Sequence, residues 1–170
     1  QKLIDDHLPY RNLEDARVPL HIVTTDIVSG DSVVLSEGPA AQAIIASTAI
    51  PGAFMPVRYK DFYLADGAIS SNTPVKVAVA KGATRLVILP TGYACAMQTP
   101  PAGAVANALH ALTLLIARQL VSELEGLDPR IEYLVVPPLC PLVGSPYDFS
   151  RTADHIERAI RSTDAWLAQN

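Results

Sequence analysis

The sequence predicts a layered α/β domain in which helices cover both faces of a mainly parallel central sheet. The first observation is that short apolar segments alternate with helical segments along the 170 residues. The second is the composition, because 49% of the residues are hydrophobic and 18% are charged, which suits a folded core and excludes a disordered chain. A chain of this length can bury a sizeable core within one domain.

Charge and cysteine content exclude several classes of partner and cofactor. The chain has 13 Lys+Arg and 17 Asp+Glu, a net charge of −4, which does not favour a nucleic-acid partner. Cys95 and Cys140 are the two cysteines, and their spacing to each other and to histidines does not match a zinc site. We therefore predict no metal and no cofactor, and we favour two buried thiols over a disulfide.

The first elements of the chain form a strand, a hairpin-like excursion and a helix. The β-branched run Val18–Thr25 predicts a buried strand, with Pro19 near its beginning. Residues 29–31 are a turn cluster, and Ser32–Leu35 predicts a second short strand. Gly38-Pro39 then opens a helix that continues to about Ser47.

The next elements are a helix stop, a strand and a short helix. Ile50-Pro51-Gly52 ends the preceding helix, and Asp61–Ala65 predicts a strand. Asn72-Thr73-Pro74 is a strong helix start, because Thr73 can cap the helix and proline suits its first position. The helix covers Val75–Lys81 and stops at Gly82.

The second half of the chain repeats the order strand, helix, strand, helix. Arg85–Leu89 is a continuous apolar run, typical of a strand buried on both faces. Apolar residues recur every three or four positions in Ala104–Glu125, which predicts a long amphipathic helix. Ile131–Val136 predicts another strand and Thr152–Leu167 a last helix. Two ion pairs are expected on that helix, Asp154–Arg158 and Glu157–Arg161.

Residues 86–117 contain no charged side chain, yet they do not predict a membrane span. Pro90, Pro100-Pro101, Asn107 and His110 interrupt the run, whereas a span needs about 20 predominantly apolar residues in one helix. A buried strand, a loop and a helix explain the run better. Contact of the surface with a lipid layer stays open.

Few residues are candidates for chemistry. The four histidines are far apart in sequence, and Asp154 and His155 point in different directions on a helix, which opposes a relay between them. The sequence contains no G-x-S-x-G elbow and no nucleotide-binding glycine pattern. Asp66-Gly67 follows a strand and precedes a helix, where ligands bind in open α/β sheets. The same dipeptide is also typical of an ordinary turn.

The stretch around Asp66 resembles the patatin-like phospholipase family. The resemblance rests on Ser47-Thr48-Ala49-Ile50-Pro51-Gly52, on Asp66-Gly67-Ala68 and on Asn72-Thr73-Pro74-Val75. It extends to Pro19–Asp26 and Gly38-Pro39, and thus covers roughly Val18–Leu89. Beyond residue 89 the layout is compatible with the family but carries no motif.

The resemblance implies hydrolysis of lipid acyl esters by a Ser–Asp dyad. Asp66 is then the catalytic carboxylate of the family's D-G-[GA] motif, which Gly67 and Ala68 complete. It would orient the serine hydroxyl and accept its proton without a histidine. Asn72 is expected to hold the loop that follows Asp66 rather than to react. The implied substrate is a lipid or another acyl ester, and a cytoplasmic or membrane-peripheral location is favoured.

The sequence departs from the family in lacking both the nucleophile elbow and the glycine-rich oxyanion loop. None of the serines in the region that carries the motifs has the context of an elbow: Ser29, Ser32, Ser36, Ser47, Ser70 and Ser71. We therefore expect residues 1–170 to be the C-terminal part of a single patatin-like domain that is incomplete on its N-terminal side. Such a chain is expected to be inactive alone, and to associate with the missing part or with itself. The alternative is a non-catalytic patatin-like module that binds a lipid or a protein.

Overall fold

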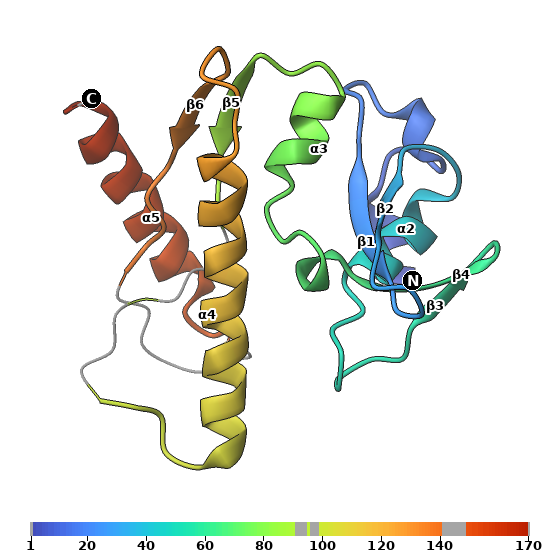
Figure 1. Ribbon diagram of the computed structural model, residues 1–170, viewed down its shortest axis with the longest axis horizontal. Helices are drawn as coiled ribbons and strands as arrows, with labels where there is room; N and C mark the ends of the chain where they lie inside the picture. The colour runs from blue at the N-terminus through green and yellow to red at the C-terminus, as the bar shows by residue number, and fades with distance from the viewer. Residues whose placement is uncertain (1, 91–94, 96–98, 141–148, 170) are drawn as a thin grey trace. The chain divides into compact units, whose positions relative to one another are not determined.

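The computed structural model describes residues 2–90, 95, 99–140 and 149–169 (Figure 1). The chain divides into two compact units, Gln1–Val77 and Ala78–Asn170. The first unit contains a four-stranded sheet and the second a two-stranded sheet. The prediction of a mixed α/β protein is therefore confirmed.

The sheet of the first unit is antiparallel throughout, with the strand order β2-β1-β4-β3. Its strands are β1 (Ile22–Asp26), β2 (Ser32–Leu35), β3 (Val57–Tyr59) and β4 (Phe62–Asp66). The expected mainly parallel central sheet is wrong for this unit. For two of the three strand pairs, the physical reason is the length of the connection. Parallel neighbours need a crossover of a dozen or more residues, whereas β1–β2 and β3–β4 are joined by short turns.

The two turns differ in how they reverse the chain. In the β1–β2 turn, Gly30 has a φ of +83°, and Asp26 accepts hydrogen bonds from Val28 N and Ser29 Oγ. In the β3–β4 turn, Lys60 has a φ of +53°, a conformation that non-glycine residues adopt mainly in tight turns. β3 was not predicted, because the prolines and glycine that precede it indicate only a loop.

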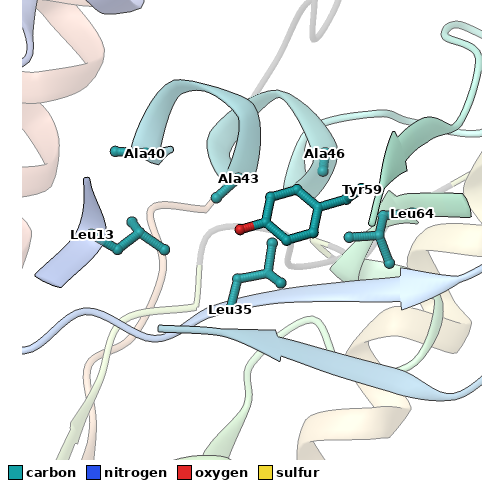
Figure 2. Close-up of a cluster of buried hydrophobic side chains, with 7 residues drawn as sticks. All are labelled: Leu13, Leu35, Ala40, Ala43, Ala46, Tyr59 and Leu64. Atoms are coloured by element: carbon teal, nitrogen blue, oxygen red, sulfur yellow. The ribbon is translucent and has the colours of Figure 1, made fainter. Parts of the chain in front are cut away.

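Helix α2 (Ala40–Ser47) packs against β1, β3 and β4 and contributes to the core of the first unit. Ala40, Ala43 and Ala46 lie on one side of α2 and are fully buried. Their small side chains let the helix axis come close to the strands. Figure 2 shows these alanines facing the other members of the core cluster, which are Leu13, Leu35, Tyr59 and Leu64.

The segment before the sheet is tied to the start of α2. It contains α1 (Lys2–His7) and the short 3-10 helix η1 (Leu13–Asp15). Leu13 N donates to Gly38 O (2.9 Å), and Gly38 N donates to Glu14 Oε2 (2.8 Å). Hydrogen bonds from the backbone amides of Glu14 itself and of Gly38 lower the pKa of the Glu14 carboxyl.

The second unit pairs β5 (Arg85–Ile88) with β6 (Glu132–Val135) in parallel, and the long helix α4 (Ala104–Glu125) lies between them in sequence. Parallel pairing, wrong for the first unit, is thus present here, where the connection is long enough for a crossover. The last helix, α5 (Thr152–Leu167), has the predicted bounds, and so has α4. Both predicted ion pairs on α5 are present, Asp154–Arg158 at 3.7 Å and Glu157–Arg161 at 2.6 Å.

Two predictions for the second unit are wrong. β5 alternates between buried and exposed residues, with Leu86 and Ile88 buried but Val87 64% exposed, so it is not covered on both faces. Cys95 and Cys140 form a disulfide, with their Cα atoms 5.7 Å apart, instead of two thiols. Because β5 and β6 are parallel, the chain leaves both strands at the same edge of the sheet, and each cysteine follows one of these strands.

Candidate functional site

Asp66 is the last residue of β4 and caps the 3-10 helix η2 (Gly67–Ile69). Its Oδ1 accepts a hydrogen bond from Ala68 N at 2.9 Å, which closes an Asx turn over Gly67. The side chain is half-buried. No described residue hydrogen-bonds to the other carboxylate oxygen, Oδ2. One carboxylate oxygen is therefore held by the backbone, and the other is available to a group outside the described residues.

The backbone of Asp66 joins two segments that carry the sequence motifs. Its amide N donates to Ala49 O (3.1 Å), and Ala49 lies within the Ser47–Gly52 motif that follows α2. Its carbonyl accepts a hydrogen bond from Thr25 Oγ1 (2.9 Å) in β1. Three stretches that are separate in sequence thus meet at one residue, as expected if they serve a common site.

Position 67 requires a glycine because there is no space for a side chain. An added Cβ atom would lie 2.4 Å from Val23 O, a backbone atom that cannot move aside cheaply. The same carbonyl accepts a hydrogen bond from Ser47 Oγ (2.8 Å). The glycine after the aspartate therefore lets η2 pack directly on β1.

The remaining motif residues lie just beyond η2. Asn72 is half-buried, and its Nδ2 is 3.5 Å from Thr73 Oγ1. The short helix α3 (Val75–Ala80) begins directly after Pro74, as predicted, and ends one residue before the expected Lys81. The role of Asn72 in holding the loop stays a prediction.

None of the six serines in the motif region hydrogen-bonds to the Asp66 carboxylate within the part of the chain that the structure describes. Several have other partners. Ser29 Oγ donates to the Asp26 carboxylate (3.1 Å), and Ser70 Oγ lies 2.8 Å from Thr25 Oγ1. Ser36 Oγ lies 2.7 Å from Nδ1 of the exposed His21, as a cross-strand pair next to the Ile22–Leu35 register position.

An open depression of about 840 Å³ lies elsewhere in the first unit. Residues of α1, α2 and β3 contribute to its lining, among them Asp5, Gln42, Ile45 and Val57. Asp66 is not among the lining residues. This depression therefore gives no evidence that a substrate binds at Asp66.

The described residues support neither a metal site nor a membrane-spanning helix. They contain no group of three or more His, Cys, Asp or Glu side chains that could hold a metal ion. In the same part of the chain, no helix combines the length and the apolar character that crossing a membrane requires.

Fold and site define a mixed α/β protein with an aspartate held at the end of a strand by the turn that follows it. A family model described as patatin-like phospholipase matches residues 2–79, which include the whole Asp66 region. Residues 2–79 are thus similar to the patatin-like phospholipase family.

Curated relatives share the same part of the chain. An uncharacterized NTE family protein of Mycobacterium bovis is 40% identical over 63 residues, as are two uncharacterized NTE family proteins of Mycobacterium tuberculosis. The matched stretch is 37% of this chain and 18% of each relative. The chain therefore matches less than a fifth of the length of these relatives.

Proposed function

We propose that the chain is the C-terminal part of a single patatin-like domain that hydrolyses lipid acyl esters, and that Asp66 is the carboxylate of its Ser–Asp dyad. The observation that carries the proposal is the geometry of Asp66. Its Oδ1 is held by Ala68 N, while Oδ2 has no hydrogen-bond partner among the described residues. The family match over residues 2–79 supports the same class of reaction.

The proposed reaction needs one proton acceptor and one nucleophile. Oδ2 of Asp66 takes the proton from a serine hydroxyl while the serine oxygen attacks the ester carbonyl carbon. The proton then passes to the alcohol that leaves, and an acyl-serine remains. A water molecule hydrolyses the acyl-serine, with the carboxylate again as the base. The hydrogen bond from Ala68 N keeps the carboxylate in one orientation during both steps.

The nucleophile in this proposal comes from sequence that precedes residue 1. None of the six serines in the motif region hydrogen-bonds to the Asp66 carboxylate within the described residues, and none stands in an elbow context. The 170-residue chain alone is therefore expected to be inactive toward acyl esters.

The proposal is tested by ester hydrolysis with the complete encoded protein. Asp66→Asn keeps an oxygen for the hydrogen bond from Ala68 N but removes the base, so kcat for a p-nitrophenyl acyl ester should fall by about 10²–10⁴-fold. Asp61→Asn is the matched control, because Asp61 is exposed in the β3–β4 turn, just before the other end of β4. It should leave kcat unchanged. Full activity of Asp66→Asn would contradict the proposed role.

The alternative is a non-catalytic patatin-like module that binds a lipid or a protein. It keeps the Asp66 turn as a structural feature and needs no serine. The residues encoded directly before Gln1 discriminate between the two functions. A glycine-rich loop followed by G-x-S-x-G supports the enzyme, and its absence supports the module. Lipid vesicle binding that is unaffected by Asp66→Asn, in a protein without esterase activity, would also support the module.

A further inference from the structure

A fully buried hydroxyl lies under the turn that carries Asp66. Thr25, in β1, is 0% exposed. Its Oγ1 donates to Asp66 O (2.9 Å) and accepts a hydrogen bond from Ser70 N (3.3 Å). Ser70 Oγ lies 2.8 Å from the same atom. One side chain of the neighbouring strand therefore contacts the residues on both sides of η2.

The hydrogen-bonding capacity of a threonine hydroxyl decides the direction of these contacts. A hydroxyl has one proton to donate and two lone pairs to accept with. The proton of Thr25 is used for Asp66 O, so the Ser70 hydroxyl must donate to Thr25 Oγ1. The amide of Ser70 supplies the second donor. All three capacities of the buried hydroxyl are thus used within this turn. The amide of Ser70 also donates to Gly67 O (3.1 Å), so loss of the hydroxyl would chiefly remove the donor to Asp66 O.

The contacts of Thr25 also connect β1 to the turn that holds the Asp66 carboxylate. Thr25 holds η2 at the carbonyl of Asp66 and at the amide of Ser70, which directly follows the helix. Ala68, whose amide holds Asp66 Oδ1, lies in the middle of η2. A shift of η2 would therefore move Ala68 N and, with it, the carboxylate.

Thr24 offers a comparison within the same strand. It is also 0% exposed, but successive side chains of a strand point to opposite faces of the sheet. Its hydroxyl donates to Val33 O in β2 (2.9 Å). The two threonines thus match in residue type, burial and kind of hydrogen bond. Thr24 is the register partner of Asp66, but its hydroxyl bonds to β2, whereas the hydroxyl of Thr25 bonds to the Asp66 turn.

We propose that Thr25 is a positioning residue that holds the Asp66 carboxylate in place through η2. The catalytic consequence of this inference rests on the proposed function, because it concerns the orientation of the proposed base. Its structural consequence, the stability of the Asp66 turn, does not depend on any activity.

The first test measures hydrogen exchange in the complete encoded protein. Thr25→Val keeps the shape of the side chain and removes the hydroxyl, so the amides of Ala68 and Ser70 should exchange about tenfold faster or more. Thr24→Val should leave these two amides unchanged. Thr25→Ser, which keeps the hydroxyl, should restore slow exchange. Equal exchange at Ala68 and Ser70 in Thr25→Val and Thr24→Val would overturn the proposal.

The second test compares kcat and KM for a p-nitrophenyl ester in the same variants. Thr25→Val should lower kcat about tenfold with KM within about twofold, whereas Thr24→Val should keep the wild-type kcat. Wild-type kcat in Thr25→Val, in an enzyme that Asp66→Asn inactivates, would overturn the catalytic consequence. If Asp66→Asn also retains activity, the proposed function has failed, and hydrogen exchange alone decides whether Thr25 holds the turn.

A milder variant covers the case in which Thr25→Val does not fold. Ser70→Ala removes one of the three partners of Thr25 Oγ1 and leaves the buried strand intact. It should accelerate exchange at Ala68 in the same direction, by a smaller factor. Unchanged exchange at Ala68 in Ser70→Ala would contradict the proposed network.

Discussion

At the scale of single residues, the site depends on a close approach of two backbones. Gly67 lies directly over the carbonyl of Val23, and its backbone is not in the left-handed region. The glycine is thus needed for space and not for an unusual φ. Thr25 is the residue in this site that the motif analysis did not single out. A pair of adjacent threonines in a buried strand was the available signal, because a buried hydroxyl must find a partner.

Replacement of Gly67 by alanine should destabilise the protein. The added Cβ would lie 2.4 Å from Val23 O, so β1 and η2 must separate. Overpacking of this kind costs about 1–3 kcal/mol of the free energy of unfolding, which chemical denaturation would measure.

Gly126→Ala is the matched control for this substitution. Gly126 has a φ of −96°, and the nearest atom to its added Cβ would be Ser122 O at 3.8 Å, an ordinary contact. It should change the free energy of unfolding by less than about 1 kcal/mol. Equal effects of both alanines would show that the close approach at Gly67 has no energetic consequence.

At the scale of elements, sequence periodicity predicted the helices better than the sheets. The bounds of α4 and α5 follow from apolar spacing alone, because a long helix is determined by contacts within about four residues. Strand direction depends on which segments pair, and a β-branched run such as that of β1 (Ile22–Asp26) carries no such information. The hairpin of β1 and β2 was nevertheless recognisable from its turn residues.

The connection between η1 and α2 should make stability depend on pH. The pKa of Glu14 is lowered in the folded protein by hydrogen bonds from its own amide and from Gly38 N. Because the pKa of Glu14 is lower in the folded protein, its contribution to stability is complete above the pKa that Glu14 has in the unfolded chain, about 4.5. It is lost as the pH falls through the lower folded-state pKa.

Thermal unfolding between about pH 3 and pH 6 would measure this contribution. The unfolding midpoint of Glu14→Gln should fall less on acidification than that of the wild type. Asp6→Asn, at an exposed position on α1, is the control and should follow the wild-type profile. Identical pH profiles for Glu14→Gln and wild type would exclude a contribution from Glu14.

At the scale of the whole molecule, many large apolar side chains of the second unit remain exposed. Helix α4 exposes Leu114 (47%) and Leu115 (65%), and helix α5 exposes Ile156 and Ile160 (56% each). Apolar surface of this extent is typical of a face that another segment or another protein covers. This agrees with the proposal that the chain is part of a larger domain.

The isolated 170-residue chain should therefore self-associate. Its mass by light scattering should rise with concentration, because burial of the exposed leucines and isoleucines is favourable. Leu115→Glu together with Ile160→Glu should reduce the association. Leu3→Glu, at a position 75% exposed on α1 in the first unit, is the control. A monodisperse monomer at all concentrations would contradict this expectation.

The sequence by itself was enough for the similarity to patatin-like phospholipases, for the Asp66-Gly67-Ala68 motif and for the long helices, because each of these depends on a short continuous stretch of the chain. Only the tertiary structure decided that the sheet around Asp66 is antiparallel, that Cys95 and Cys140 are joined, and that Thr25 lies beneath the Asp66 turn. The physical reason is that these features depend on contacts between residues that are distant in sequence. Local propensity does not encode which segments pair, whereas the packing of the folded chain does.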